Sequence, residues 1–221
     1  MRVQAVLFDL DGTLIDTLTD IADAMNGALR EFSLPEWDRE EYRYLVGDGA
    51  RKLAERAVRN RAELADPVRQ AYQRRYEAGC MNASRPYPGM EETLLALAEQ
   101  GLRLCVFSNK PDADTRRIIR RYFPKTAFDA VRGQIEGIPV KPDPTGALTI
   151  AASLGIAPEH FLYLGDTAVD MTCARRAGMT PVGALWGFRT EKELRESGAA
   201  VVLKEPGELT GWKDWDQRAF R

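Results

Sequence analysis

Residues 3–14 read Val-Gln-Ala-Val-Leu-Phe-Asp-Leu-Asp-Gly-Thr-Leu, a short apolar run that stops at Asp9. Such a run is typical of a strand that is buried on both faces of a parallel sheet. Asp9 and Asp11 stand two residues apart at its end, and Gly12 follows where the backbone must turn or approach a ligand closely. The pair suits a nucleophile and an acid/base that share one small site, whereas the structural alternative is a capped junction between strand and loop.

Further apolar runs and helical patterns follow along the chain. The runs cover residues 102–107, 161–164, 182–185 and 200–202. The helical patterns cover residues 90–100, 111–123, 144–154 and 167–177. Because strands alternate with helices, the sequence predicts an α/β fold with a Rossmann-like parallel sheet as its core.

The segment 17–80 breaks this alternation, because its apolar residues step by three or four and no strand pattern appears. It predicts an all-helical insertion of three to five helices, and the proline-rich stretch 86–89 marks its exit. We therefore expect two domains: an α/β catalytic core of residues 1–16 and 84–221, and a helical cap domain of residues 17–83.

Polar residues that suit phosphate binding follow the later strands. In open α/β sheets, ligands bind at the carboxyl ends of the strands. Ser108 and Asn109 end the second apolar run, where a hydroxyl and backbone amides could bind a phosphate oxygen. Lys141 precedes a proline that holds it extended, so it can act as a point charge for phosphate. The structural alternatives are a helix cap and a solvated lysine.

Two more aspartates follow the third apolar run, Asp166 at its end and Asp170 one helical turn later. Carboxylates of this kind are ligands of hard cations such as Mg²⁺, although a helix cap and a surface aspartate would look the same. Together with Asp9 and Asp11 they would repel a phosphate dianion, and Lys141 supplies a single positive charge. A divalent cation between carboxylates and phosphate resolves this conflict, so a phosphate site here predicts obligatory Mg²⁺.

Composition excludes several other classes of protein. The chain has 221 residues, enough for one large domain or a core with a modest insertion. Its net charge of −2 gives no basic footprint for nucleic acid, and its single histidine excludes a zinc site built from several histidines. Three distant cysteines without a CxxC motif favour reduced thiols in a cytoplasmic protein. No stretch approaches the roughly 18 apolar residues of a membrane span.

The motifs at residues 9–13, Ser108, Lys141 and residues 165–170 resemble, in this order, the four motifs of the haloacid dehalogenase superfamily. The resemblance covers the whole chain, including the helical insertion after the first motif. Within the superfamily the sequence is most similar to the phosphoglycolate phosphatase branch.

This resemblance implies a role for each motif residue. Asp9 would attack phosphorus and form an aspartyl-phosphate, while Asp11 would protonate the leaving oxygen and then activate water. Ser108 would hydrogen-bond the transferring phosphoryl group, assisted by Asn109, and Lys141 would neutralise developing charge.

The resemblance also implies the ligands of the cofactor, which would be Mg²⁺. Asp9, the backbone carbonyl of Asp11, and Asp166 would hold the ion, with Asp170 as a further carboxylate.

In the family the helical cap closes over the site and contacts the leaving group. A glycine-rich turn at residues 47–49 leads into a helix, which suits an anion-binding tip. We expect Arg51 or Lys52 to pair with a carboxylate or second phosphate of the substrate; the alternative is a flexible loop beside a charged helix face.

The expected function is that of a Mg²⁺-dependent phosphomonoester hydrolase, with phosphoglycolate as the first-choice substrate. Pyrophosphate, sugar phosphates and nucleoside monophosphates remain open. A phosphosugar mutase would use the same two aspartates, and a non-enzymatic binding module is a third class. The expected partner is a small phosphorylated metabolite, with neither nucleic acid nor membrane, and the expected assembly is a monomer or homodimer.

Overall fold

A six-stranded parallel sheet forms the centre of the molecule in the computed structural model, which describes residues 3–79 and 81–214. The strand order is β5-β4-β1-β6-β7-β8, and each neighbouring pair is parallel. The strands are β1 (Ala5–Phe8), β4 (Arg103–Pro111), β5 (Ala130–Gln134), β6 (Phe161–Gly165), β7 (Thr180–Ala184) and β8 (Val201–Leu203). The predicted α/β fold with a parallel sheet core is confirmed.

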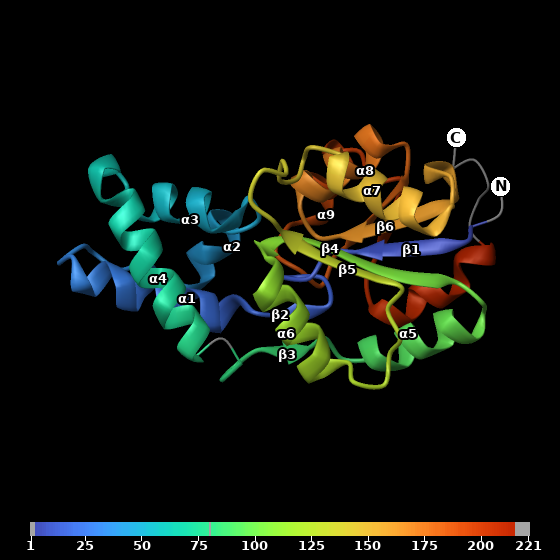
Figure 1. Cartoon of the computed structure of the whole chain (residues 1–221), viewed down its shortest axis with the longest axis horizontal. Helices are drawn as coiled ribbons and strands as arrows, with labels where there is room; N and C mark the ends of the chain where they lie inside the picture. The colour runs from blue at the N-terminus through green and yellow to red at the C-terminus, as the bar shows by residue number, and fades with distance from the viewer. Residues whose placement is uncertain (1–2, 80, 215–221) are drawn as a thin grey trace.

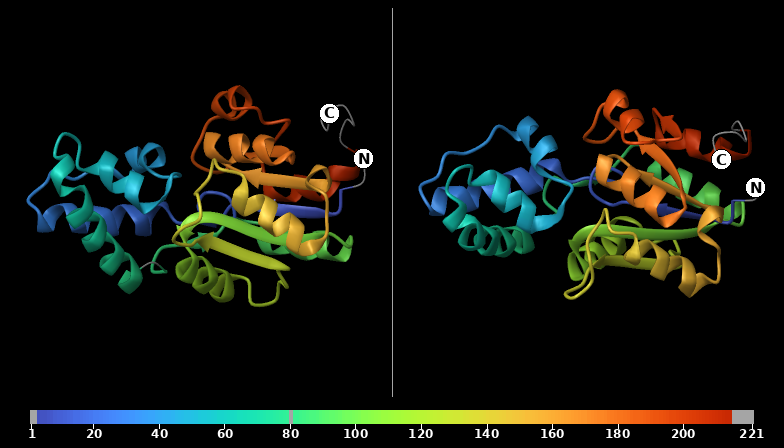
Figure 2. Two further views of the ribbon diagram at one scale, coloured as in Figure 1. Left: turned by 45° about the horizontal axis from the view of Figure 1, so that its top comes forward. Right: turned by 90° about the horizontal axis from the view of Figure 1, so that it is seen from above.

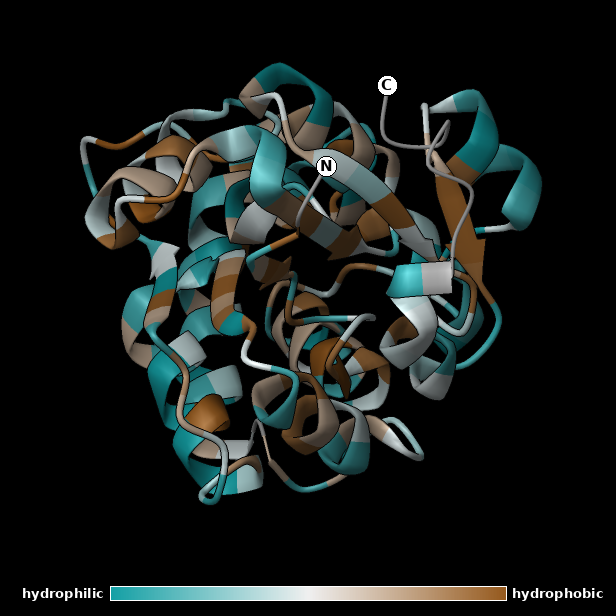
Figure 3. Ribbon diagram, turned by 90° about the vertical axis from the view of Figure 1, so that its right-hand side faces the viewer, coloured by the Kyte–Doolittle hydropathy of each residue, from teal (hydrophilic) through white to brown (hydrophobic). Residues whose placement is uncertain are grey.

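Helices cover both faces of this sheet (Figure 1). They are α5 (Met90–Glu99), α6 (Asp112–Tyr122), α7 (Thr145–Leu154), α8 (Ala168–Ala177) and α9 (Glu191–Glu196), with 3-10 turns η3 (Pro158–His160) and η4 (Pro206–Asp214). Successive side chains of a strand point to opposite faces. Val6 and Phe8 of β1 therefore pack with α5 and α6, whereas Ala5 and Leu7 pack with α7 and α8. Burial on both faces explains why the strand reads as a continuous apolar run, and Figure 3 shows hydrophobic residues gathered along the central strands.

The segment between β1 and β4 contains a separate group of helices, which we call the helical lobe. Its helices are α1 (Leu18–Glu31), α2 (Tyr42–Leu45), α3 (Gly49–Ala57) and α4 (Ala65–Gly79), with 3-10 turns η1 (Arg39–Glu41) and η2 (Ala62–Leu64). The lobe has its own hydrophobic cluster, centred on residues such as Met25 and Leu29, and projects from one end of the sheet (Figures 1 and 2). This separate cluster supports our proposed division of the chain at residues 17–83.

Two short antiparallel strands join the helical lobe to the sheet, β2 (Ile15–Asp16) and β3 (Arg85–Pro86). Beside them, the buried carboxylate of Asp20 accepts hydrogen bonds from the backbone amides of Ala83 (2.9 Å) and Ser84 (2.8 Å) and from the Ser84 hydroxyl. The two chain crossings are thereby tied to each other, which fixes the direction in which the lobe leaves the sheet.

Several features differ from the sequence-based expectation or extend it. The edge strand β5 was not predicted, because Ala-Val-Arg-Gly-Gln is neither an apolar run nor a regular alternation.

Cys105 and Cys173 are buried free thiols, as expected for reduced cysteines, while Cys80 lies outside the described residues. None of the helices in the described part of the chain is both long enough and apolar enough to cross a bilayer.

We predict that Asp20→Ala lowers the free energy of unfolding by about 2–4 kcal/mol, because hydrogen bonds to a charged group each contribute about 1.5–3 kcal/mol. Urea unfolding measures this change. Asp23→Ala, on the exposed side of the same helix, is the matched control and should stay within about 0.5 kcal/mol of the wild type. A loss below about 1 kcal/mol for Asp20→Ala would show that the crossings hold together without it.

Candidate active site

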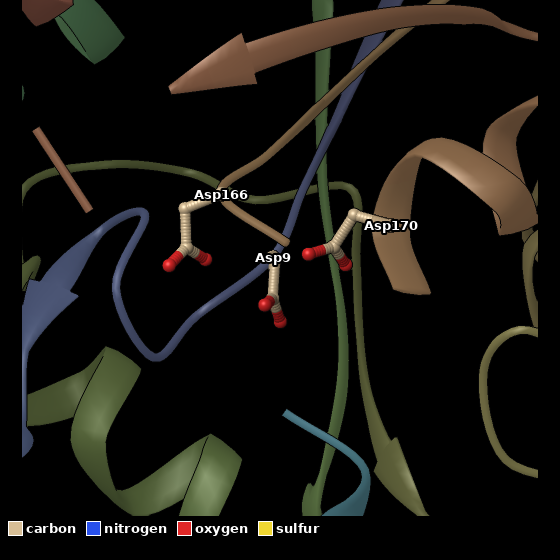
Figure 4. Close-up of side chains that lie close together, drawn as sticks. All are labelled: Asp9, Asp166 and Asp170. Atoms are coloured by element: carbon tan, nitrogen blue, oxygen red, sulfur yellow. The ribbon is translucent and has the colours of Figure 1, made fainter. Parts of the chain in front are cut away.

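Three buried aspartates meet at the carboxyl ends of the central strands. Asp9 follows β1, Asp166 follows β6, and Asp170 lies in the first turn of α8. Since β1 and β6 pair in register, with Phe8 opposite Leu164, the loops after them emerge side by side. One carboxylate oxygen from each aspartate lies within 4.8 Å of the others (Figure 4). We call these three residues the acidic cluster.

Lys141 is the cation that contacts this cluster. Its ammonium lies 2.7 Å from Asp9 Oδ1 and 2.7 Å from Asp170 Oδ1, and its side chain is only 1% exposed. The second oxygen of Asp170 accepts hydrogen bonds from the backbone amide and hydroxyl of Thr167, which caps α8. Both oxygens of Asp170 are therefore engaged by the protein, one by Lys141 and the other by the cap of α8.

The acidic cluster carries more negative charge than Lys141 can balance. Burial raises the pKa of Asp9 to about 7, with repulsion from Asp170 adding to the shift and Lys141 opposing it. Burial also raises the pKa of Asp166 well above its usual range, again with Asp170 contributing. Carboxylate oxygens are the ligands that hard divalent cations prefer, and such an ion would relieve this repulsion. The acidic cluster, with Asp9 and Asp166 beside Asp170, therefore fits a divalent cation.

Asp11, two residues beyond Asp9, lies outside the acidic cluster and has different partners. Lys110 Nζ is 2.9 Å from each of its carboxylate oxygens, and the Thr17 hydroxyl donates to it at 2.7 Å. Gly12 follows with φ of 84°, and a Cβ at this position would lie 2.3 Å from Asp166 Oδ2. Only glycine therefore allows the loop to bring Asp11 beside the acidic cluster.

Ser108 and Asn109 lie near the carboxyl end of β4, beside the same site. Both are buried, and the Ser108 hydroxyl accepts a hydrogen bond from the amide of Lys110 at 3.1 Å. The Asn109 side chain links three segments by hydrogen bonds. It donates to the backbone carbonyls of Gly47 and Lys141 and accepts from the backbone amide of Lys141. Asn109 thereby positions Lys141 and contacts the helical lobe, in addition to its predicted place near the substrate.

A cavity lies between the acidic cluster and the helical lobe. Asp9, Asp11, Ser108 and Asn109 line its floor. The remaining walls are mostly apolar or aromatic, with a few polar side chains: Ile21, Val46, Gly47, Gly49, Ala50, Leu53, Tyr72, Gln73, Tyr76, Lys110, Pro111, Asp114 and Phe188. The sheet thus supplies most of the polar groups and the helical lobe most of the apolar ones.

Arg51 and Lys52, which the sequence predicts as substrate-binding residues, do not line this cavity. Their side chains are 81% and 58% exposed, and both pair with Glu55 on the surface of α3. Their predicted contact with the substrate gains no support from this geometry. Lys110, which was not predicted to have a role, is in the cavity wall instead. A local signal existed, because Lys110 stands two residues after Ser108 and alternate residues of a strand share a side.

The loop after β7 connects the acidic cluster to the helical lobe. The backbone amide of Phe188 donates to Asp166 Oδ2 at 2.8 Å. Arg189 donates to the carbonyls of Arg43 and Val46 in the helical lobe, and Arg43 donates back to the Gly187 carbonyl at 2.9 Å. These contacts hold the lobe over the cavity, and no local sequence pattern announces them.

The chain is similar to known proteins over most of its length. The profile of the haloacid dehalogenase-like hydrolase family matches residues 6–184. A phosphoglycolate phosphatase of Aquifex aeolicus is 33% identical, covering 97% of each chain. An N-acetylmuramic acid 6-phosphate phosphatase of Pseudomonas aeruginosa is also 33% identical, covering 95% of this chain and 94% of its own. The crystal structure of a predicted phosphoglycolate phosphatase from Haemophilus somnus superposes with a TM-score of 0.89 at 27% identity, covering 96% of this chain and 99% of its own.

We predict that Lys141→Met lowers the free energy of unfolding of the metal-free protein by about 3–5 kcal/mol. Removing one partner of a buried ion pair leaves the other uncompensated, here Asp9 and Asp170 together. Urea unfolding in the presence of chelator measures the loss. Lys125→Met is the matched control, since that side chain is 77% exposed, and it should change little. A cost of less than about 1 kcal/mol for Lys141→Met would contradict a structural role for this pair.

Proposed function

Because the chain belongs to the haloacid dehalogenase-like hydrolase family and is a phosphatase, we propose that it is a Mg²⁺-dependent hydrolase of phosphomonoesters, with 2-phosphoglycolate as its preferred substrate. The observation that carries the proposal is the placement of Asp9 between Lys141 and Asp166, with Asp11 and Ser108 in the wall of the same cavity. These groups supply a nucleophile, a cation site, an acid/base and a phosphate contact.

In the first step, Asp9 attacks phosphorus through a carboxylate oxygen. A bond forms between that oxygen and phosphorus while the bond from phosphorus to the leaving oxygen breaks, which gives an aspartyl-phosphate. Lys141, fixed against Asp9 and Asp170, holds the nucleophile in place and balances charge as the phosphoryl group moves. Mg²⁺ bound by Asp9 and Asp166 would neutralise the negative charge of the phosphate and orient it.

Asp11 handles the protons in both steps. It gives a proton to the leaving oxygen and then takes one from the water that attacks the aspartyl-phosphate, so the second step releases phosphate and restores Asp9. Thr17 and Lys110 hold its carboxylate at the cavity wall. The Ser108 hydroxyl is placed to donate to the transferring phosphoryl group. The helical lobe covers the cavity, which limits access of bulk water before the aspartyl-phosphate forms.

The lining of the cavity favours a leaving group with few hydroxyls. Its walls on the lobe side are mostly apolar, so they offer few hydrogen-bond partners to the hydroxyl groups of a sugar. That suits phosphate with a two-carbon group better than a phosphorylated amino sugar, the kind of substrate named for the Pseudomonas aeruginosa relative. Phosphoglycolate is also the substrate in the names of several relatives, which supports the same choice.

Pyrophosphate, sugar phosphates and nucleoside monophosphates are the competing substrates. A phosphosugar mutase would carry out the first step alike but return the phosphoryl group to a sugar. The relatives that support hydrolysis are named as phosphatases. A cytoplasmic location and a monomeric or dimeric state remain predictions.

We predict that the protein releases phosphate from 2-phosphoglycolate with a kcat/KM at least tenfold above that for pyrophosphate, glucose 6-phosphate or a nucleoside monophosphate. Phosphate release is measured for each compound with Mg²⁺ and with chelator, and activity should vanish with chelator. A higher kcat/KM for any competitor would replace the proposed substrate. Full activity in chelator would remove the metal from the mechanism.

We predict that Asp9→Asn abolishes turnover, with a loss of at least about 1,000-fold, because an amide cannot serve as the attacking nucleophile. The variant should remain folded, since asparagine has nearly the same shape and removes one of the crowded negative charges. Single-turnover assays and thermal unfolding measure the two properties. Near-normal activity in this variant would assign the nucleophile to another residue.

A further inference from the structure

Lys110 is the only lysine or arginine among the described residues that line the cavity. Lys141 lies beneath the floor between Asp9 and Asp170, where it serves the reacting phosphate. Arg51 lies outside the cavity, paired with Glu55 on the lobe surface. An anionic group on the leaving-group side of the substrate therefore has one cationic partner in this wall.

The position of Lys110 relative to Asp11 defines where that partner can act. Lys110 Nζ lies 2.9 Å from both oxygens of Asp11 and 4.4 Å from the centre of the Tyr76 ring, which belongs to α4. Its side chain is only 5% exposed. Lys110 thus stands between the proposed acid/base and the wall that faces the leaving group.

Lys110 has the charge and the hydrogen-bonding capacity to bind a second anion. Its side chain is an ammonium that forms an ion pair with the Asp11 carboxylate. An ammonium has three donors, and the two oxygens of Asp11 engage at most two of them at the observed distances.

We propose that Lys110 binds the carboxylate of the leaving group and sets a preference for phosphate esters of small hydroxy acids over those of neutral alcohols. The proposal rests on the proposed function, because Asp11 must stand at the leaving oxygen. In 2-phosphoglycolate the carboxylate carbon lies two bonds beyond that oxygen. The carboxylate therefore comes close to Lys110, which contacts Asp11.

The other cavity walls restrict where a carboxylate can bind. Ile21, Leu53 and Tyr72 offer largely apolar surface, on which a charged group loses its hydration without compensation. Asp114 also lines the cavity and repels an anion, although Arg117 Nη2, 2.9 Å from Asp114 Oδ1, offsets part of its charge. Among the described side chains that line the cavity, Lys110 is the one whose charge can compensate a carboxylate.

A competing role for Lys110 is to hold Asp11 in place without touching the substrate. The two roles differ in what the substrate must carry. A residue that only holds Asp11 affects every phosphate ester alike, whereas a residue that binds the carboxylate affects only esters that have one.

The test compares 2-phosphoglycolate with 2-hydroxyethyl phosphate, which has a hydroxymethyl group in place of the carboxylate. We expect the wild type to prefer 2-phosphoglycolate in kcat/KM. Lys110→Met should lower the ratio of the two values at least tenfold, mainly through KM for 2-phosphoglycolate. Lys192→Met is the control for loss of a lysine, because that side chain is 82% exposed on α9, and it should keep the wild-type ratio.

The outcomes separate the inference from the proposed function. A wild type without preference for 2-phosphoglycolate would show that the proposed substrate is wrong, and the inference would fall with it. A wild-type preference that Lys110→Met retains, including equal losses on both substrates, would overturn only the role of Lys110. The ratio of kcat/KM for 2-phosphoglycolate to that for 2-hydroxyethyl phosphate is also measured in the double variant Arg51→Met and Lys52→Met. A tenfold fall there, and not in Lys110→Met, would assign carboxylate binding to α3 and overturn the inference as well.

Two measurements keep the proposal decidable if Lys110→Met folds poorly or is too slow to assay. Calorimetric affinities of both compounds for the Asp9→Asn protein, with and without Lys110→Gln, give the same ratio without turnover. A crystal structure of Asp9→Asn with 2-phosphoglycolate should place Lys110 Nζ within about 3.2 Å of a substrate carboxylate oxygen. A carboxylate bound elsewhere in the cavity would overturn the assignment.

Discussion

The ion pairs of Lys141 are the constraint on which the site depends. A lysine that is 1% exposed is tolerable only with well-placed anions, and here Asp9 and Asp170 provide them. Asp9 follows β1, Asp170 begins α8, and Lys141 comes from the loop before α7. One buried ammonium thus joins three segments that are distant in the sequence. The same contacts that satisfy its charge hold the proposed nucleophile in position, so folding and chemistry share one interaction.

Much of the fold and of the acidic cluster could be predicted from the sequence, because both produce strong local signals. Burial of β1 on both faces requires an unbroken apolar run, and the run stops where the chain reaches the edge of the sheet. Ligands of a parallel sheet bind where such runs stop, which is why the positions of Asp9 and Asp166 at the edge of the sheet could be predicted from the sequence. The helical lobe was equally visible, since its helices repeat apolar residues at helical spacing.

What escaped prediction depends on contacts between distant segments. The strand β5 forms because β4 offers its edge, although its own sequence favours no strand. Arg51 looked suitable beside a glycine-rich turn, but the direction of α3 turns it towards Glu55 and solvent. Lys110 and Arg189 were not assigned to the site, because their partners Asp11 and Val46 are about a hundred or more residues away. Only the assembled sheet and lobe determine these pairings.

The placement of charge separates the tasks of the sheet and the helical lobe. The groups proposed to act on phosphate, and Lys110 with them, belong to the sheet and its loops, where parallel strands fix them relative to one another. The lobe contributes mostly apolar walls and is attached through hydrogen bonds such as those of Arg189 to backbone carbonyls. Because Lys110 shares β4 with Ser108, its distance from the phosphate site does not depend on how far the lobe closes. Recognition of the leaving group can therefore precede closure, and closure can serve to exclude water.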